Sequence, residues 1–126
     1  MNIVDSSGWL EFFANGPNAE VFSEPLTDPA KLIVPTISLY EVFKVILRRR
    51  GEDAALQAAA LMYQATMAEL TAELALSAAR VSIEHKLPMA DSIMLTTARA
   101  YDALFWTQDR DFEKIPEVRF VPPFPE

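Results

Sequence analysis

Short segments with the character of strands alternate with longer segments of helical periodicity, and this alternation most restricts the folds open to the chain. The strand segments are Asn2–Val4, Lys31–Val34, Glu69–Thr71, Ala103–Thr107 and Val118–Val121, of which Glu69–Thr71 is the weakest. Between them, apolar residues recur at intervals of three and four, which is typical of amphipathic helices. Strands that alternate with helices predict a parallel sheet with helices on both faces.

Breaker residues set the ends of the predicted helices. Pro35 ends the second strand and leaves Thr36 available as a helix cap, and Gly51 ends the helix that follows. Pro88 supplies the fixed φ of a first helical turn. The predicted helices are the one that contains Trp9–Phe13 and those over 36–50, Glu52–Met67, Ala72–Lys86 and about 88–101, while the segment between Gly16 and Pro29 is of ambiguous type.

Length and composition indicate one globular domain over residues 1–126. The chain is 51% hydrophobic, with apolar and charged residues interspersed throughout, which suffices for a core of ordinary size. No apolar run reaches the ~18 residues that a membrane span needs, and the N-terminus lacks the basic region and cleavage site of a signal peptide. We therefore expect a cytoplasmic protein with no membrane partner.

The residue types present leave carboxylates as the groups available for chemistry. The chain has no Cys, which excludes disulfides, thiolate metal sites and Cys nucleophiles, and it has a single His. That residue, His85, lies near the end of a predicted helix between Glu84 and Lys86, where a favourable dipole interaction explains it. The net charge of −7 argues against broad electrostatic attraction to nucleic acid but allows a local basic path, and it suits a cation site.

Four acids from distant parts of the sequence are predicted to meet at one edge of the sheet. Asp5 directly follows the first strand and Asp109 follows the strand that ends at Thr107, while Glu41 and Asp91 lie near helix starts. In parallel sheets, ligands bind at the carboxyl ends of the strands. Because close carboxylates repel one another, a cation stabilises them, and ligands that are all oxygen select Mg²⁺ or Mn²⁺ over Zn²⁺.

Each acid also has an ordinary structural explanation. Asp5 also fits the role of N-cap of the following helix, and Ser38 with Glu41 matches a capping box. Asp91 suits the dipole of its helix, and Asp109 and Asp111 suit the turn that holds Phe112. Four such coincidences together are less probable than one shared site.

Four segments give the chain a resemblance to a known family. They are Val4-Asp5-Ser6-Ser7, the helical Glu41 after Ile33-Val34-Pro35-Thr36, Leu87-Pro88-Met89-Ala90-Asp91-Ser92, and Trp106-Thr107-Gln108-Asp109-Arg110-Asp111-Phe112. Together they resemble the PIN-domain nucleases, and more narrowly the VapC toxins of type II toxin-antitoxin systems. The resemblance covers nearly the whole chain. Each motif is weak alone, and the four are specific jointly.

The resemblance implies a three-layer α/β/α fold with a central parallel sheet of four or five strands. It also implies an endoribonuclease that hydrolyses RNA with Mg²⁺ or Mn²⁺, through water activated by one or two ions. Matching motifs place the catalytic metal site on Asp5, Glu41, Asp91 and Asp109, with Asp111 as a possible further member. The family implies a homodimer restrained by a small antitoxin of the VapB kind.

Several other residues are weaker candidates. Ser6 and Thr107 lie beside the acids in sequence and are candidates to orient them or a bound water. A run of three arginines is a candidate RNA contact, although cations also suit a helix C-terminus. Three aromatic residues are candidates for a partner groove, although aromatic residues at helical spacing are more often core. These two groups are Arg48, Arg49 and Arg50, and Trp9, Phe12 and Phe13.

Two alternative functions remain open at this point. A receiver-like phosphoacceptor domain also places acids and Mg²⁺ at the edge of a parallel sheet. It requires an acidic pair after the first strand and a Lys after a late strand, and neither Asp5-Ser6 nor Trp106-Thr107 supplies these. The other alternative is a non-catalytic metal-binding interaction module, which an RNA cleavage assay with and without EDTA separates from a nuclease.

Overall fold

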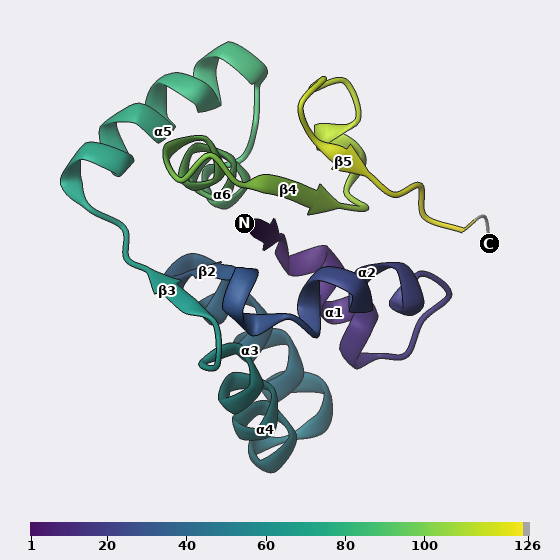
Figure 1. The fold of residues 1–126 in the computed structure, drawn as a ribbon. Helices are drawn as coiled ribbons and strands as arrows, with labels where there is room; N and C mark the ends of the chain where they lie inside the picture. The colour runs from purple at the N-terminus through teal and green to yellow at the C-terminus, as the bar shows by residue number, and fades with distance from the viewer. Residues whose placement is uncertain (125–126) are drawn as a thin grey trace.

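A computed structural model describes residues 1–124 of the chain and shows short strands alternating with helices (Figure 1). The strands are β1 (Asn2–Val4), β2 (Ile33–Pro35), β3 (Thr66–Ala68), β4 (Leu104–Thr107) and β5 (Arg119–Phe120). The helices are α1 (Ser6–Phe13), α2 (Ala19–Leu26), α3 (Thr36–Arg50), α4 (Glu52–Met62), α5 (Ala72–His85) and α6 (Met89–Ala100). Two short 3₁₀ helices, η1 (Pro29–Lys31) and η2 (Arg110–Phe112), complete the order.

All the paired strands are parallel, which confirms the predicted type of sheet. β4 lies between β1 and β5, and β2 pairs with β3. A single bridge between Asn2 and Leu32 joins the two groups, so the strand order is β3-β2-β1-β4-β5. The five strands thus form a three-stranded and a two-stranded sheet that meet at one bridge.

β1, β2 and β4 separate two hydrophobic cores because successive side chains of a strand point to opposite faces of the sheet. Val4, Val34 and Trp106 enter the core formed with α1 to α4, whereas their neighbours Ile3, Ile33 and Phe105 enter the core formed with α5 and α6. Figure 1 shows the corresponding layers, with α5 and α6 on one side of the strands and α1 to α4 on the opposite side. The predicted three-layer α/β/α arrangement is therefore confirmed.

The third strand lies earlier in the sequence than predicted. The helix predicted over Glu52–Met67 ends at Met62, and β3 occupies Thr66–Ala68 rather than Glu69–Thr71. Thr71 instead caps α5, where its hydroxyl accepts the N–H of Leu74 at 3.1 Å. The error arose because a strand of three residues contains too little periodicity to be distinguished from the end of a preceding helix.

The second strand and its helix are also shifted from the prediction. β2 covers Ile33–Pro35 instead of Lys31–Val34, and Lys31 lies in η1. Pro35 has φ −62° and ψ 140°, which fits both an extended backbone and the residue before a helix. Pro35 is the N-cap and Thr36 is already helical, so the predicted cap at Thr36 is wrong. The ambiguous segment before η1 contains α2.

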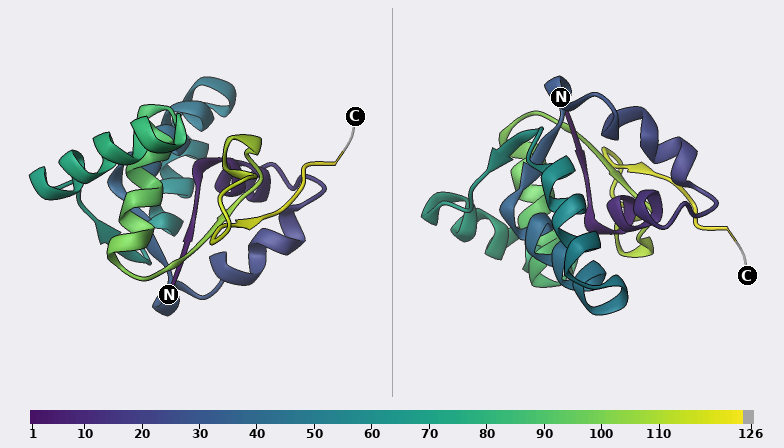
Figure 2. Two further views of the ribbon diagram at one scale, coloured as in Figure 1. Left: turned by 90° about the horizontal axis from the view of Figure 1, so that it is seen from above. Right: turned by 90° about the horizontal axis from the view of Figure 1, so that it is seen from below.

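The C-terminal segment contacts the start of α2, where the carbonyl of Pro122 accepts a hydrogen bond from Asn18. In both views of Figure 2 this segment runs past the start of α2.

Within the described residues, no helix has the length and apolar character required to cross a membrane.

Candidate metal centre

Asp5 and Thr107 lie side by side because β1 and β4 are adjacent parallel strands that end at the same level. Val4 is in register with Trp106, and the N–H of Asp5 donates to the carbonyl of Trp106 at 3.0 Å. The Thr107 hydroxyl donates to Asp5 Oδ2 at 2.6 Å and accepts the N–H of Asp109 at 2.9 Å. One threonine therefore connects two of the predicted acids.

Asp5 is also the N-cap of α1, so its ordinary structural explanation is correct as well. Its Oδ1 accepts the Gly8 N–H at 3.0 Å and the Ser7 hydroxyl at 2.7 Å. A Cβ on Gly8 would lie 2.4 Å from Val4 Cγ1, so glycine is needed for α1 to start this close to β1. The Asp5 side chain is 2% exposed and is held at both oxygens.

The most compact group of acids consists of Asp91, Asp109 and Asp111. One carboxylate oxygen from each lies within 4.8 Å of the other two. Asp91 is in the first turn of α6, whose other end leads into β4, so the helix begins at the sheet edge where β4 ends. Asp109 caps η2 by accepting the Asp111 N–H at 2.9 Å. Asp111, a secondary candidate from the sequence, thus belongs to this group.

Glu41 approaches the group from α3 and is oriented by Ser6. The Ser6 hydroxyl donates to Glu41 Oε1 at 2.7 Å. The capping box suggested for Ser38 and Glu41 is wrong. α3 begins at Thr36, which places Ser38 inside the helix, where its hydroxyl is buried without a hydrogen-bond partner.

Burial and mutual repulsion raise the pKa values of two of these acids. The pKa of Asp91 rises to about 7, first because of burial and then because of Asp109, Asp5, Asp111 and Glu41. Burial raises the pKa of Asp5 to about 6, although its hydrogen bonds oppose the change. Among the described residues, the ion pairs involve Glu84, Glu117 and Glu113, so no Lys or Arg neutralises the five acids.

These properties fit a hard divalent cation. The available ligand atoms are carboxylate oxygens, which Mg²⁺ and Mn²⁺ prefer. A cation placed among Asp91, Asp109 and Asp111 would remove the repulsion that raises the pKa of Asp91. Asp5 and Glu41 extend the same negative field from β1 and α3.

The aromatic residues suggested for a partner groove are mainly core. Trp9 is completely buried and stacks on Phe13 with their ring centroids 5.6 Å apart, so the groove prediction is wrong for Trp9. Phe12 and Phe13 are half-buried against the same core. The prediction failed because helical spacing identifies an apolar face but does not show whether the protein itself covers it.

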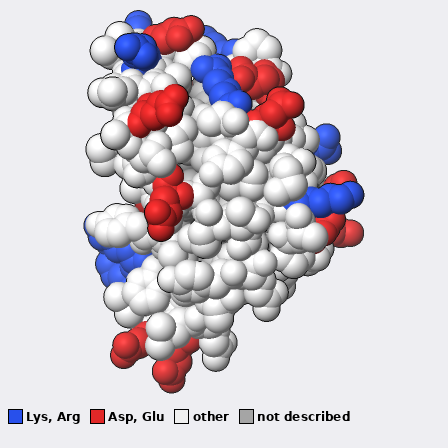
Figure 3. Space-filling model, turned by 60° about the vertical axis from the view of Figure 1, so that its left-hand side comes forward, with Lys and Arg blue, Asp and Glu red and all other residues white. Residues whose placement is uncertain are grey.

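The arginine run lies apart from the acids. Arg48, Arg49 and Arg50 are exposed in the last turn of α3, and at 1.5 Å per residue Arg48 is about 10 Å along the helix from Glu41. Figure 3 shows acidic and basic side chains dispersed on the face that it draws, around a broad uncharged area. His85 contacts Arg99, with Nε2 3.3 Å from Nη2, and lies outside the group of acids.

Two contacts to the site were not predicted. Ser7, considered only as a cap, hydrogen-bonds Asp5 and also accepts the Gln108 N–H at 3.3 Å. Asn18, read only as a helix breaker, donates to Gln108 Oε1 at 3.0 Å. Sequence offers no signal for the second contact because its partners are 90 positions apart.

The fold and the acids define an α/β/α protein with an acidic centre at the carboxyl edge of a parallel sheet. The chain belongs to the PIN domain family, whose model matches residues 3–118. This is a nuclease family, and the resemblance seen in the sequence is thereby confirmed at the level of the family. Membership also sets aside the receiver-like alternative. No curated protein matches the chain significantly.

Solved structures share the fold over nearly the whole chain. A toxin-antitoxin complex from Klebsiella pneumoniae has a TM-score of 0.79 and 22% identity, with coverage of 98% of each chain. A sarcin-ricin loop cleaving VapC toxin of Mycobacterium tuberculosis has a TM-score of 0.78 and 21% identity, covering 97% of this chain and 100% of that chain. A DNA-bound VapBC complex of Rickettsia felis has a TM-score of 0.73 and 12% identity, covering 95% and 96%. At these sequence identities, the similarity shows a shared fold and nothing more.

Proposed function

We propose that residues 1–126 form a single PIN domain that acts in the cytoplasm as a Mg²⁺- or Mn²⁺-dependent endoribonuclease, the toxin of a type II toxin-antitoxin system. The observation that carries the proposal is the convergence of Asp91 with Asp109, Asp5, Asp111 and Glu41 without a neutralising Lys or Arg among the described residues. Such a cluster is unfavourable without a cation, so a purely structural role explains it poorly.

The side chains of the chain divide into ligands and residues that orient them. Asp91, Asp109 and Asp111 are close enough to hold one ion, and Asp5 and Glu41 add charge beside them. A bound divalent ion supplies activation of water and neutralisation of phosphate charge. Thr107 and Ser6 fix Asp5 and Glu41 through their hydroxyl groups, which supports the secondary roles predicted for them.

RNA is the proposed substrate because a PIN relative with the same fold is described as cleaving the sarcin-ricin loop. We expect discrete RNA fragments from the purified, partner-free protein with total RNA and Mg²⁺, and none with excess EDTA. Cleavage products are separated on a denaturing gel, with Mg²⁺ restored after chelation as the control.

Cleavage that persists in EDTA would contradict the metal mechanism. Binding of Mn²⁺ without cleavage of any RNA would instead support the non-catalytic interaction module.

A small antitoxin is the proposed partner, and two of the solved relatives are toxin-antitoxin assemblies. An apolar groove of about 630 Å³ between α3 and α4 offers a docking surface that replaces the one predicted at Trp9. It begins at Thr36 and Tyr40, beside Glu41, so a segment in the groove can direct a basic side chain toward the acids. Its apolar lining residues include Leu39, Phe43, Leu47, Leu56 and Tyr63.

Expression without the antitoxin is expected to slow growth, and co-expression to restore it. Tyr40→Asp is expected to keep toxicity but lose rescue, because it places a charge in the groove while the acids remain intact. Colony counts under induced expression measure both effects. Toxicity that survives in the double variant Asp5→Asn, Asp91→Asn would show that it does not arise from this site.

A homodimer is proposed through the outer face of α5. Leu76 and Ile83 on this face are 67% and 82% exposed, while Val81 on the opposite face is buried. With Ala72 and Ala79 they form an apolar stripe at intervals of four, three and four residues. An antiparallel two-fold pairing sets Leu76 against the other copy's Ala79 and Ile83 against its Ala72, so large side chains meet small ones.

Ile83→Asp is expected to convert the dimer into a monomer, because it places a charge in this apolar stripe, opposite Ala72 of the other copy. The exposed position keeps the fold intact. Sedimentation velocity measures the change, and Glu84→Gln, also exposed on α5, is the matched control. A wild-type protein that sediments as a monomer would exclude the dimer.

A further inference from the structure

Asn18 is a buried amide that joins three distant parts of the chain. It lies between α1 and α2, is 3% exposed, and donates through Nδ2 to Gln108 Oε1 and to the carbonyl of Pro122, both at 3.0 Å. Its backbone N–H donates to Glu11 Oε2 at 2.7 Å, which fixes the position of Asn18 itself. A buried amide is unfavourable unless it is hydrogen-bonded, so these contacts hold their partners firmly.

The partner Gln108 stands directly before the acids of the loop. It links Thr107, at the end of β4, to Asp109. Its N–H donates to the Ser7 hydroxyl at 3.3 Å, and that hydroxyl donates to Asp5 Oδ1 at 2.7 Å. A continuous set of contacts therefore runs from Asn18 through Gln108 and Ser7 to Asp5.

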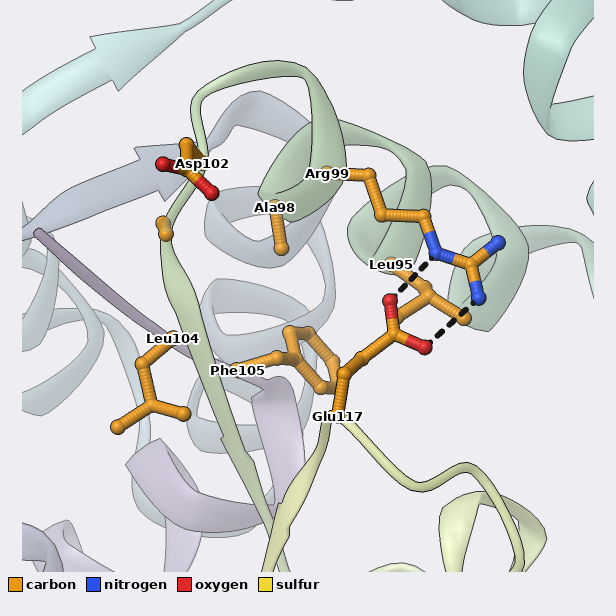
Figure 4. A pocket seen from close by; sticks show the side chains of 8 residues that line it. Leu95, Ala98, Arg99, Asp102, Leu104, Phe105 and Glu117 are labelled. Atoms are coloured by element: carbon orange, nitrogen blue, oxygen red, sulfur yellow. Dashed lines mark hydrogen bonds and ion pairs between the residues drawn. The ribbon is translucent and has the colours of Figure 1, made fainter.

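The loop that follows Gln108 has a second anchor far from the acids. Glu117 accepts from Arg99 Nε at 2.8 Å and from Arg99 Nη2 at 3.0 Å, as the paired dashed lines in Figure 4 show. This pair holds the loop against the end of α6, while Asp91 lies at the start of that helix. The Asp109 end of the loop is held locally, by the Thr107 hydroxyl that accepts the Asp109 N–H and by the contacts of Gln108, rather than by the distant ion pair.

We propose that Asn18 is a positioning residue for the metal centre, which holds Asp109 and Asp111 beside Asp91 by fixing Gln108; this inference rests on the proposed metal-dependent function. The carboxylates of the loop are repelled by Asp91 and tend to move away from it. The hydrogen bond from Asn18 opposes that movement. The free protein thus keeps its acids at the separation that a cation requires.

The test is a double-mutant cycle read by Mn²⁺ affinity, which does not depend on RNA cleavage. Asn18→Ala and Gln108→Ala are each expected to weaken Mn²⁺ binding about tenfold or more, the range seen when residues that orient metal ligands are removed. The double variant is expected to bind no more weakly than the weaker single variant, because both changes break the same contact. Gln57→Ala, an exposed amide on α4, is the matched control and is expected to match the wild type.

Thermal melts accompany each titration so that loss of folding is distinguished from loss of binding. Gln108 is only half-buried, so Gln108→Ala provides the test even if Asn18→Ala does not fold. Wild-type Mn²⁺ affinity in Gln108→Ala would overturn the proposal, as would additive losses in the double variant. If the wild type bound Mn²⁺ but cleaved no RNA, the proposed function would fail while the positioning role stood.

Discussion

Asp91→Asn is expected to abolish metal-dependent RNA cleavage while leaving the protein folded. Asparagine keeps the shape of the side chain but removes the charge at the centre of the most compact group of acids. Without the ion, the transition state loses several kcal/mol of stabilisation, and this lowers the rate on the order of a thousandfold. Initial rates of fragment formation at saturating Mg²⁺ measure the loss.

The same substitution is expected to alter how stability depends on pH in the metal-free protein. The pKa of Asp91 is raised from 3.8 to about 7 in the folded state, so between these values the folded protein binds more protons than the unfolded chain. This extra proton binding by Asp91 contributes to the free energy of unfolding at about pH 4, and the contribution is lost as the pH rises through about 7. Melting temperatures in EDTA should therefore fall less steeply with pH in Asp91→Asn, and at pH 7.5 equal or exceed the wild-type value.

Glu84→Gln, which removes an exposed acid outside the site, is the control for this comparison. A lower melting temperature with normal cleavage would mean that Asp91 serves mainly its helix dipole.

Asp5→Ala is expected to lose both cleavage and stability, in contrast to Asp91→Asn. The aspartate caps α1 through Gly8 and accepts the Thr107 hydroxyl, so alanine leaves these buried donors without a partner. Removal of a helix cap costs about 1 kcal/mol in the free energy of unfolding. Urea unfolding at pH 5 measures this cost below the raised pKa of Asp5, where its negative charge adds little.

Asp5→Asn is the matched variant, because its remaining carbonyl oxygen can still accept the Gly8 N–H. We expect it to be as inactive as Asp5→Ala but more stable. Equal stability of the two variants would show that the cap contributes nothing, and full activity in either would remove Asp5 from the metal centre.

The parts of the fold that depend on local pattern were predictable from the sequence. β1 and β4 are buried apolar runs followed directly by polar residues, so Asp5 and Asp109 were placed at the correct edge of the sheet. β3 was not predicted correctly, because Met67 and Ala68 continue the apolar pattern of α4. Only their pairing with Val34 and Pro35 makes them a strand, and that pairing is a tertiary contact.

The hydrogen-bond partners of the side chains at the site were predicted less well than the positions of these residues in the fold. The nearness of Ser6 and Thr107 to the acids was visible in the sequence, yet the sequence does not show that Ser6 contacts Glu41 rather than Asp5. Whether Trp9 faces the core or the solvent was equally hidden, because both possibilities give the same spacing. These orientations depend on which elements pack against each other, and the elements concerned are far apart in the sequence.

The single bridge between Asn2 and Leu32 makes the middle of the sheet a line of weak backbone connection. Asp5 follows the strand on one side of this line, and Glu41 lies on the helix that follows the strand on the other side. A cation bound beside both acids would attract the two sides toward one another, so hydrogen exchange of the amides in β1 and β2 should slow when the ion binds. The proposed cleavage and the cohesion of the sheet would then depend on the same ion, and removing the metal would abolish the first and loosen the second.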